Sequence, residues 1–286
     1  MTTNTPPLTT IIKTSRRAPW ARWGVKSAAF TYLIVLLFIP LVVIFQDGLR
    51  GGLDGLWQSI TQPIPWAALG LTLWTSALMA LINAVMGTLT AYVLVRYNFP
   101  GKSFLNAIID LPLAIPTLVT GVMLVVLYGP QSALGGWLKT TFDWRIIFAP
   151  SGIILALLFI NYPFVVRAVQ PVLESLDQES EEAAATLGAG AATIFWDVTL
   201  PAIRLPILSG ALLSFARAIG EFGAIVVVAG NIPFRTLTSA IYVFGEVESS
   251  NRQGASAMSI VMLSIAFGLV LFVDWLRRRG QKEQTA

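Results

Sequence analysis

The chain has 286 residues, of which 55% are hydrophobic and only 12% are charged, and its formal net charge is +4. Soluble domains carry about 25% charged residues, so this composition indicates an integral membrane protein. The absence of cysteine excludes disulfides and thiolate metal sites, and the absence of histidine argues against most hydrolase chemistry.

The first 26 residues are polar and basic, and an uncharged segment follows them. Residues 27–46 contain no charge over 20 positions, which is about the length of a transmembrane helix. No small-x-small cleavage site follows this segment. It therefore indicates an uncleaved first span rather than a signal peptide.

Five further apolar segments follow, separated by polar loops. They lie at residues 67–95, 105–128, 146–166, 206–229 and 253–273, and the main loops lie at residues 47–65, 129–150 and 231–252. The segment at residues 67–95 predicts one tilted helix that ends near Arg96. Six spans predict an all-α polytopic membrane protein with both termini on the same side.

The third apolar segment contains two prolines. Pro112 and Pro116 lie inside residues 105–128, and a proline within a helix removes a backbone donor. The pair therefore predicts a kink, with freed carbonyls satisfied by neighbouring helices. This kink would serve either a gate or only helix packing.

The stretch at residues 173–206 differs from the rest of the chain because it is polar and acidic. Between Arg167 and Arg204 there are six carboxylates and no lysine or arginine. Small or apolar residues recur at helical spacing from Leu173 to Leu187. That pattern predicts a helix on the protein surface, not a span.

Two glycines and a proline divide this acidic stretch. Gly188 and Gly190 predict the end of the surface helix, since glycine adopts the required backbone conformation readily. A second short helix is expected at residues 191–198, and Pro201 is expected to stop it because proline lacks the amide donor. A loop of this size between membrane spans usually has a function of its own.

The distribution of basic residues assigns the two faces of the protein. Thirteen lie on the face that carries both termini and the acidic stretch, five lie on the other face, and one lies within the fifth span. The positive-inside rule places the first face in the cytoplasm. We expect a cytoplasmic tail at residues 1–26, a six-span domain at residues 27–276 with a cytoplasmic loop at residues 171–205, and a second cytoplasmic tail at residues 277–286.

A charged pair lies inside the fifth span. Arg217 and Glu221 are four residues apart, so a continuous helix would place them on one face. Each charge alone is costly within a membrane, and pairing lowers that cost. The pair would either fix helix packing or line a translocation path together with Gly220 and Phe222. In the second case the arginine could attract an anion.

The acidic stretch also carries a spaced pattern: Glu182-Ala183-Ala184, three residues, Gly188, nine residues, then Val198-Thr199-Leu200-Pro201. It closely resembles the EAA signature of ABC-importer permeases and departs from it only at Val198, where that family usually has isoleucine. The resemblance implies a cytoplasmic coupling helix that docks in a groove of an ATP-binding subunit. The implied coupling residues are Glu182, Ala183, Ala184, Gly188, Leu200 and Pro201. The alanines permit close backbone approach, and the glutamate offers a charge-assisted contact.

A second resemblance lies in the fifth span and the loop after it. The runs from Ser214 to Ala224 and from Ala229 to Pro233 are similar to the sulfate/thiosulfate branch of the sulfate and molybdate importer permeases, and most similar to its T-type subunit. The similarity extends from the first span to the sixth. It implies a type I ABC importer in the bacterial plasma membrane. Its other parts would be a homologous W-type permease, two ATP-binding subunits and an external sulfate-binding protein.

The chain itself is expected to be non-catalytic. It lacks the G-x-x-x-x-G-K-[ST] phosphate-binding motif, so no cofactor is expected here and the partner would bind ATP and magnesium. A molybdate or tungstate permease would work by the same mechanism and remains open. An ion-coupled secondary anion transporter would not need the coupling segment and usually shows internal repeats, which are not evident.

Overall fold

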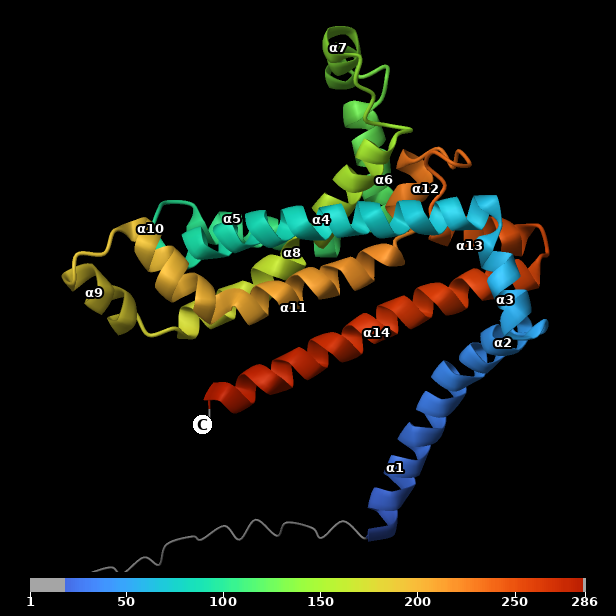
Figure 1. The fold of residues 1–286 in the computed structure, drawn as a ribbon, viewed down its shortest axis with the longest axis horizontal. Helices are drawn as coiled ribbons and strands as arrows, with labels where there is room; N and C mark the ends of the chain where they lie inside the picture. The colour runs from blue at the N-terminus through green and yellow to red at the C-terminus, as the bar shows by residue number, and fades with distance from the viewer. Residues whose placement is uncertain (1–18, 285–286) are drawn as a thin grey trace, which may run out of the picture. The chain divides into compact units, whose positions relative to one another are not determined.

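A computed structural model describes residues 19–284, with side chains given for residues 23–276 and Arg278. Every secondary-structure element in this described part is a helix (Figure 1), which confirms the all-α prediction. In chain order they are α1 (Pro19–Leu33), the π-helix η1 (Ile34–Phe38), α2 (Ile39–Gly48), α3 (Gly52–Thr61), α4 (Pro63–Arg96), α5 (Lys102–Ala114), α6 (Thr117–Tyr128), α7 (Ala133–Phe142), α8 (Pro150–Ser175), α9 (Glu179–Thr186), α10 (Ala191–Ile194), the π-helix η2 (Phe195–Thr199), α11 (Leu200–Ile219), α12 (Gly223–Val228), α13 (Ser239–Glu248) and α14 (Arg252–Gln284).

Among the described residues, five helical segments are long and apolar enough to cross a membrane, or six if the bent pair α5 and α6 is one span. The five are Trp23–Gly48, Pro63–Arg96, Pro150–Ser175, Ala191–Ile219 and Arg252–Leu276. This agrees with the six predicted spans, and α4 ends at Arg96 as expected. The chain divides into two units, residues 1–46 and residues 47–286.

Helix α8 forms the centre of residues 47–286. More than half of its membrane-length window is buried, and it packs against both α4 and α11. Two glycines permit this close packing: a Cβ at Gly87 of α4 would lie 2.9 Å from the Val165 Cβ, and one at Gly210 of α11 would lie 3.0 Å from the Val165 Cα. Small residues are favoured at such contacts because membrane helices associate through close packing.

The predicted kink in the third span is a sharp break. Helices α5 and α6 meet at an angle of 108°, so residues 105–128 do not form one bent helix. Ile115 has extended backbone angles, with φ −87° and ψ 128°, and Pro116 follows it. A proline disfavours the helical conformation of the residue before it, which explains why the helix ends there. Pro112, by contrast, lies inside α5.

The prediction that Pro201 ends a short helix is wrong. Helical structure runs from Ala191 through η2 and α11 to Ile219, so the helix that contains the fifth span begins well before Pro206 and ends before Ala229. The Leu200 amide donates to the Phe195 carbonyl, an i to i+5 bond that widens this turn. Pro201 lies inside this continuous helix, directly after η2, and an interior proline is tolerated where a local π-helical turn adjusts the backbone pairing around it.

Other predicted boundaries shift because helices extend beyond their most apolar residues. Helix α8 continues to Ser175, so Leu173 belongs to the buried core and does not begin a surface helix. The three main loops expected from the sequence contain the short helices α3, α7 and α13. Helix α1 begins at Pro19, inside the predicted tail, and α14 continues to Gln284; residues 1–18 and 285–286 lie outside the described residues.

Candidate functional site: the α9–α10 hairpin and the Arg217–Glu221 pair

The acidic stretch folds into a helical hairpin, residues 179–199, in which α9 is followed by α10 and η2 (Figure 1). Gly188 ends α9 with φ +88°, as the sequence predicts for a glycine at this position. The Ala189 amide donates to the Ala184 carbonyl and the Gly188 amide donates to the Ala185 carbonyl. These two bonds are those of a Schellman motif, so the turn has a defined geometry.

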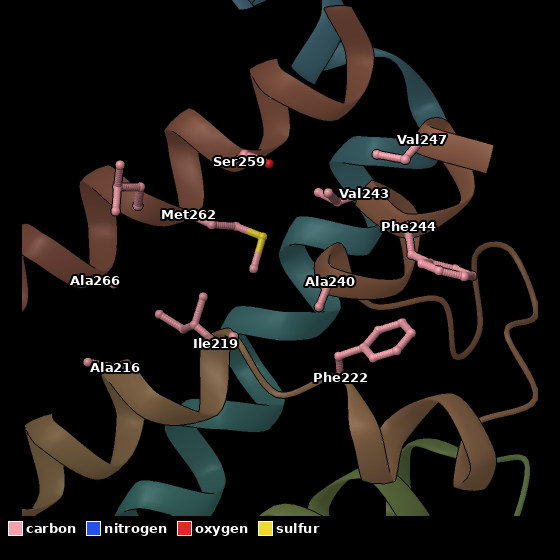
Figure 2. A pocket seen from close by; sticks show the side chains of 12 residues that line it. Ala216, Ile219, Phe222, Ala240, Val243, Phe244, Val247, Ser259, Met262 and Ala266 are labelled. Carbon is pink, nitrogen blue, oxygen red and sulfur yellow. The ribbon is translucent and has the colours of Figure 1, made fainter. Parts of the chain in front are cut away.

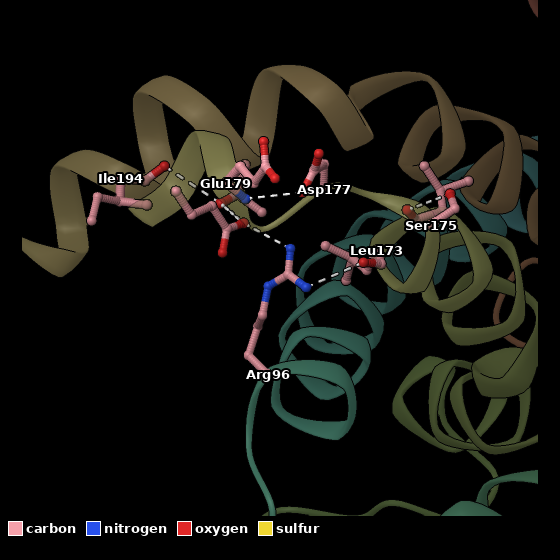
Figure 3. Close-up of polar contacts among 9 residues, drawn as sticks. Arg96, Leu173, Ser175, Asp177, Glu179 and Ile194 are labelled. Atoms are coloured by element: carbon pink, nitrogen blue, oxygen red, sulfur yellow. Dashed lines mark hydrogen bonds and ion pairs between the residues drawn. The ribbon is translucent and has the colours of Figure 1, made fainter. Parts of the chain in front are cut away.

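A buried ion pair attaches this hairpin to the end of α4. The Arg96 Nη2 donates to the Glu181 Oε1 at 2.8 Å, and their side chains are 9% and 16% exposed. The Thr199 hydroxyl donates to the same oxygen at 2.8 Å, and the Arg96 Nη1 donates to the Leu173 carbonyl at 3.2 Å (Figure 3). One carboxylate therefore joins both arms of the hairpin to α4, and one guanidinium joins it to α8.

An aromatic contact supports the same junction. The Phe195 ring meets the Tyr92 ring edge to face, with centroids 5.3 Å apart, and Trp196 packs against Phe195. Edge-to-face pairs of this kind add to the stabilisation given by burial alone. The hairpin is thus held at two points against the last turns of α4.

The residues assigned to coupling lie on this hairpin and just beyond it. Their shared feature is that none is buried: Glu182, Ala183, Gly188 and Pro201 are exposed, and Ala184 and Leu200 are half-buried. Helix α9 has no buried residue. Leu187 is 89% exposed and Trp196 is 63% exposed, so the hairpin presents apolar surface that no described residue covers.

The sequence pattern missed the residues that hold the hairpin in place. The charge-assisted contact of Glu182 with a partner subunit stays a prediction; within the chain, the paired carboxylate belongs to the neighbouring Glu181. Arg96 and Thr199 were not singled out. The available signal was that Arg96 ends a long apolar segment close to a carboxylate-rich loop, but its partner lies 85 residues further along the chain.

Arg217 and Glu221 do interact, but not on one continuous helix. Helix α11 ends at Ile219, and Glu221 lies in the break before α12. The Arg217 Nη1 donates to the Glu221 Oε2 at 2.9 Å, while the Glu221 Oε1 accepts the Ala224 amide at 3.2 Å. Glu221 therefore pairs with the arginine and also caps the first turn of α12.

The two members of this pair differ in exposure. The Glu221 side chain is 2% exposed, and the Arg217 side chain is 39% exposed. Gly220 and Phe222 line an apolar groove of about 530 Å³ between α11, α13 and α14 (Figure 2). Arg217 lines a second groove, of about 440 Å³, with residues of α8 and α14. Arg217, Gly220 and Phe222 thus line grooves, whereas Glu221 lines neither.

A second arginine, Arg167, has all of its donors engaged within the chain. The Arg167 guanidinium makes two bonds to the Asp110 carboxylate, two to Asn106 and one to the Gln170 side chain. These five bonds use its full set of donors and join α8 to α5. Arg217 uses one donor on Glu221, so it has donors left for another ligand or chain.

Because Glu221 is buried and Arg217 is partly exposed, removing one partner of this pair should cost more stability than removing the other. We expect Arg217→Gln to lower the free energy of unfolding by about 1–3 kcal/mol, because it leaves a buried carboxylate without its cation. Glu221→Gln should cost less, about 1 kcal/mol, since the amide oxygen can still accept the Ala224 amide. Thermal unfolding of the purified variants checks the order. A larger loss for Glu221→Gln would contradict it.

Comparison with known proteins places these features in a family. Residues 83–282 match the family described as binding-protein-dependent transport system inner membrane component. A protein from Synechocystis sp. named sulfate transport system permease protein CysT is 38% identical over 283 residues, covering 99% of both chains. A protein from Zygnema circumcarinatum named probable sulfate transport system permease protein cysT is 39% identical, covering 87% of this chain and 86% of its own.

Solved structures share the fold. A chain of a bacterial alginate ABC transporter, crystallised with an alginate-bound periplasmic protein, matches with a TM-score of 0.76 at 18% identity, covering 91% of this chain and 94% of that one. A second structure of a bacterial alginate importer matches with a TM-score of 0.73, also at 18% identity, over 91% and 96% of the two chains. With more than two thirds of its sequence matched, this chain belongs to the family of binding-protein-dependent transport system inner membrane components.

Proposed function

We propose that this chain is the membrane-spanning permease subunit of an ATP-driven importer of sulfate and thiosulfate, and that the α9–α10 hairpin couples it to ATP-binding subunits. The relatives' names support the substrate, and the fold supports the transporter class. The observation that carries the coupling role is the exposed apolar surface at Leu187 and Trp196, on a hairpin that is itself firmly attached.

A partner surface explains this combination. Exposed leucine and tryptophan side chains on a water-facing hairpin favour burial against another protein, because removing apolar area from water is stabilising. Ala183 lies on α9 of this hairpin, is exposed, and would allow the backbone of a partner to approach closely. Glu182, which no side chain of this protein neutralises among the described residues, would meet a donor on the partner.

The attachment of the hairpin suggests how movement is transmitted. In the proposed cycle, ATP-driven closure of two ATP-binding subunits moves the hairpin as a rigid lever. The Arg96 to Glu181 bond would pass this movement to α4, and the unbroken helix from α10 to α11 would pass it to the fifth span. The spans would then alternate between inward-open and outward-open states.

Energy from ATP suits a divalent anion. Moving one charge against 100 mV costs about 2.3 kcal/mol, so a dianion entering a cell with a negative interior faces about twice that cost. Because the sequence lacks the G-x-x-x-x-G-K-[ST] motif, we infer that ATP and magnesium act in the partner subunits and that this chain supplies no catalytic group. The proposed complex also contains a homologous W-type permease and an external sulfate-binding protein.

The proposed location is a bacterial plasma membrane, with both termini and the α9–α10 hairpin in the cytoplasm. The excess of basic residues on that face supports this orientation. In this arrangement the N-terminal end of α8 and the loops beside α7 face outward. Cysteine labelling from the outside at Ser132, and its absence at Ser180, would check the assignment.

Uptake of radiolabelled sulfate tests the substrate. Cells lacking this chain should regain uptake when it is restored, and excess thiosulfate but not molybdate should suppress that uptake. Suppression by molybdate, or failure to restore sulfate uptake in a correctly inserted complex, would move the substrate to molybdate, tungstate or another anion. Uptake that persists in ATP-depleted cells with an imposed ion gradient would instead indicate a secondary transporter.

A further inference from the structure

A cavity of about 490 Å³ lies at the opposite end of α8 from the hairpin. Its walls come from the end of α6, from α7, from the loop that precedes α8 and from the loop after α12. Residues 145–149 of this lining lead directly into α8, whereas the hairpin follows its other end. A helix of 26 residues spans about 39 Å, so the cavity and the hairpin are separated by the thickness of a membrane.

Three cations from separate segments line this cavity. Lys139 comes from α7, Arg145 from the loop before α8 and Arg235 from the loop after α12. No acidic residue is among the lining residues. In the part of the chain whose side chains are described, none of the three forms an ion pair, whereas Arg50 on the same predicted face is paired with Asp47.

The backbone that carries two of these cations is well fixed. Thr236, next to Arg235, is fully buried; its hydroxyl accepts the Ile232 amide at 3.1 Å, and its amide donates to the Ile232 carbonyl at 2.9 Å. In the other loop, Ile147 is buried and the Phe148 amide donates to the Val228 carbonyl at 2.9 Å. The fold therefore holds the loops that carry Arg145 and Arg235 where both residues line the same cavity.

A concave surface with charges of one sign focuses the electrostatic potential and raises the local concentration of counter-ions. Asp143 lies in the loop between Lys139 and Arg145, but it is exposed and does not line the cavity. All three cations are also exposed, so a bound anion would keep part of its hydration. Binding at such a site is expected to be weak and rapidly reversible.

We propose that this cavity binds a small tetrahedral oxyanion through Lys139, Arg145 and Arg235. The oxyanion is either free sulfate or the phosphate of an anionic lipid headgroup. The choice of sulfate rests on the proposed function, while the cation cluster itself is independent of it. With sulfate as the ligand, the cavity collects the anion on the face opposite the hairpin, before it reaches the spans.

Chemical protection of Lys139 tests the proposal without relying on transport. The assembled complex, in nanodiscs of phosphatidylcholine, is labelled with an amine-reactive reagent in sulfate or in chloride of equal ionic strength, and labelling is read by peptide mass spectrometry. With a dissociation constant of about 5 mM, about 10 mM sulfate would occupy two thirds of the sites and slow labelling of Lys139 about threefold. Labelling of Lys102, which lies on α5, should not change.

Variants identify the ligands of the anion. Arg145→Gln combined with Arg235→Gln should abolish the protection of Lys139, and Arg252→Gln, an exposed cation outside the cavity, should preserve it. Neither replaced side chain makes a described bond within the fold, so the double variant is expected to insert and unfold like the wild type. If sulfate protects Lys139 equally in the wild type, in the Arg145→Gln and Arg235→Gln double variant and in Arg252→Gln, the proposal is wrong.

Lipid composition separates the two sources of the anion. If the headgroup is the ligand, phosphatidylglycerol nanodiscs should slow Lys139 labelling without sulfate, and added sulfate should have little further effect. If free sulfate is the ligand, lipid composition should not matter. If neither sulfate nor phosphatidylglycerol protects Lys139, the anion site is rejected. That result would leave sulfate uptake, and hence the proposed function, unaffected. Protection in a complex that fails to import sulfate would support the site and reject that function.

Discussion

Replacing Gly188 by aspartate is expected to reduce uptake by more than about tenfold while leaving membrane insertion intact. Gly188 forms the turn of the hairpin with φ +88°, and a Cβ there would meet no atom within 4 Å, so the chain itself has space for the substitution. The new carboxylate would lie on the proposed contact surface. A loss of about 2 kcal/mol at a central interface residue is ordinary, and about 1.4 kcal/mol corresponds to tenfold.

Conformational strain must be separated from the loss of docking. A residue other than glycine in this backbone conformation costs about 1 kcal/mol. Gly101 offers a matched control, because it has φ +87°, also has open space around its Cβ position and lies outside the hairpin. Gly101→Asp should therefore show the strain without loss of docking, offset in part because Gly101 is the N-cap of α5, where aspartate is favoured, and uptake should be near normal. Equal losses from both substitutions would indicate strain rather than docking, and normal uptake with Gly188→Asp would reject the coupling surface.

Replacing Arg96 by methionine is expected to lower stability by about 3 kcal/mol and to separate ATP hydrolysis from transport. The substitution leaves the Glu181 carboxylate mostly buried without its cation, which is the costly way to break a buried ion pair. It also removes the ion pair between the hairpin and α4, while leaving the Phe195–Tyr92 contact and the proposed docking surface in place. The assembled complex should therefore hydrolyse ATP and move less sulfate per ATP.

Two comparisons test this interpretation. Arg278→Met removes an exposed pair with Asp274, whose side chains are 75% and 55% exposed, and should change stability by less than about 0.5 kcal/mol. Combining Arg96→Met with Glu181→Gln should restore part of the lost stability, because no unpaired charge remains. It should not restore the transport per ATP, since the ion pair between the hairpin and α4 is still absent. If the double variant recovers both its stability and its sulfate transport per ATP, Arg96 acts only through stability.

Much of the fold was predictable because it depends on local sequence. A run of about 20 uncharged residues must form a helix in a membrane, where backbone groups have no water to bond, so the spans could be identified from composition. The turn at Gly188 was predictable for a similar reason, since its conformation is cheap only for glycine. Boundaries were less predictable: Pro201 was expected to end a helix but lies within one that runs from Ala191 to Ile219.

What only the tertiary structure decided is which distant side chains meet. The sequence by itself determined a six-span, all-α protein with an exposed acidic hairpin and a charged pair at Arg217 and Glu221. It did not show that Glu181 is the carboxylate that Arg96 holds. Nor did it bring Lys139 and Arg235 to one cavity. Such contacts depend on helix crossing angles and loop paths, which follow from packing between segments far apart in the chain and leave no periodic signal within any one of them.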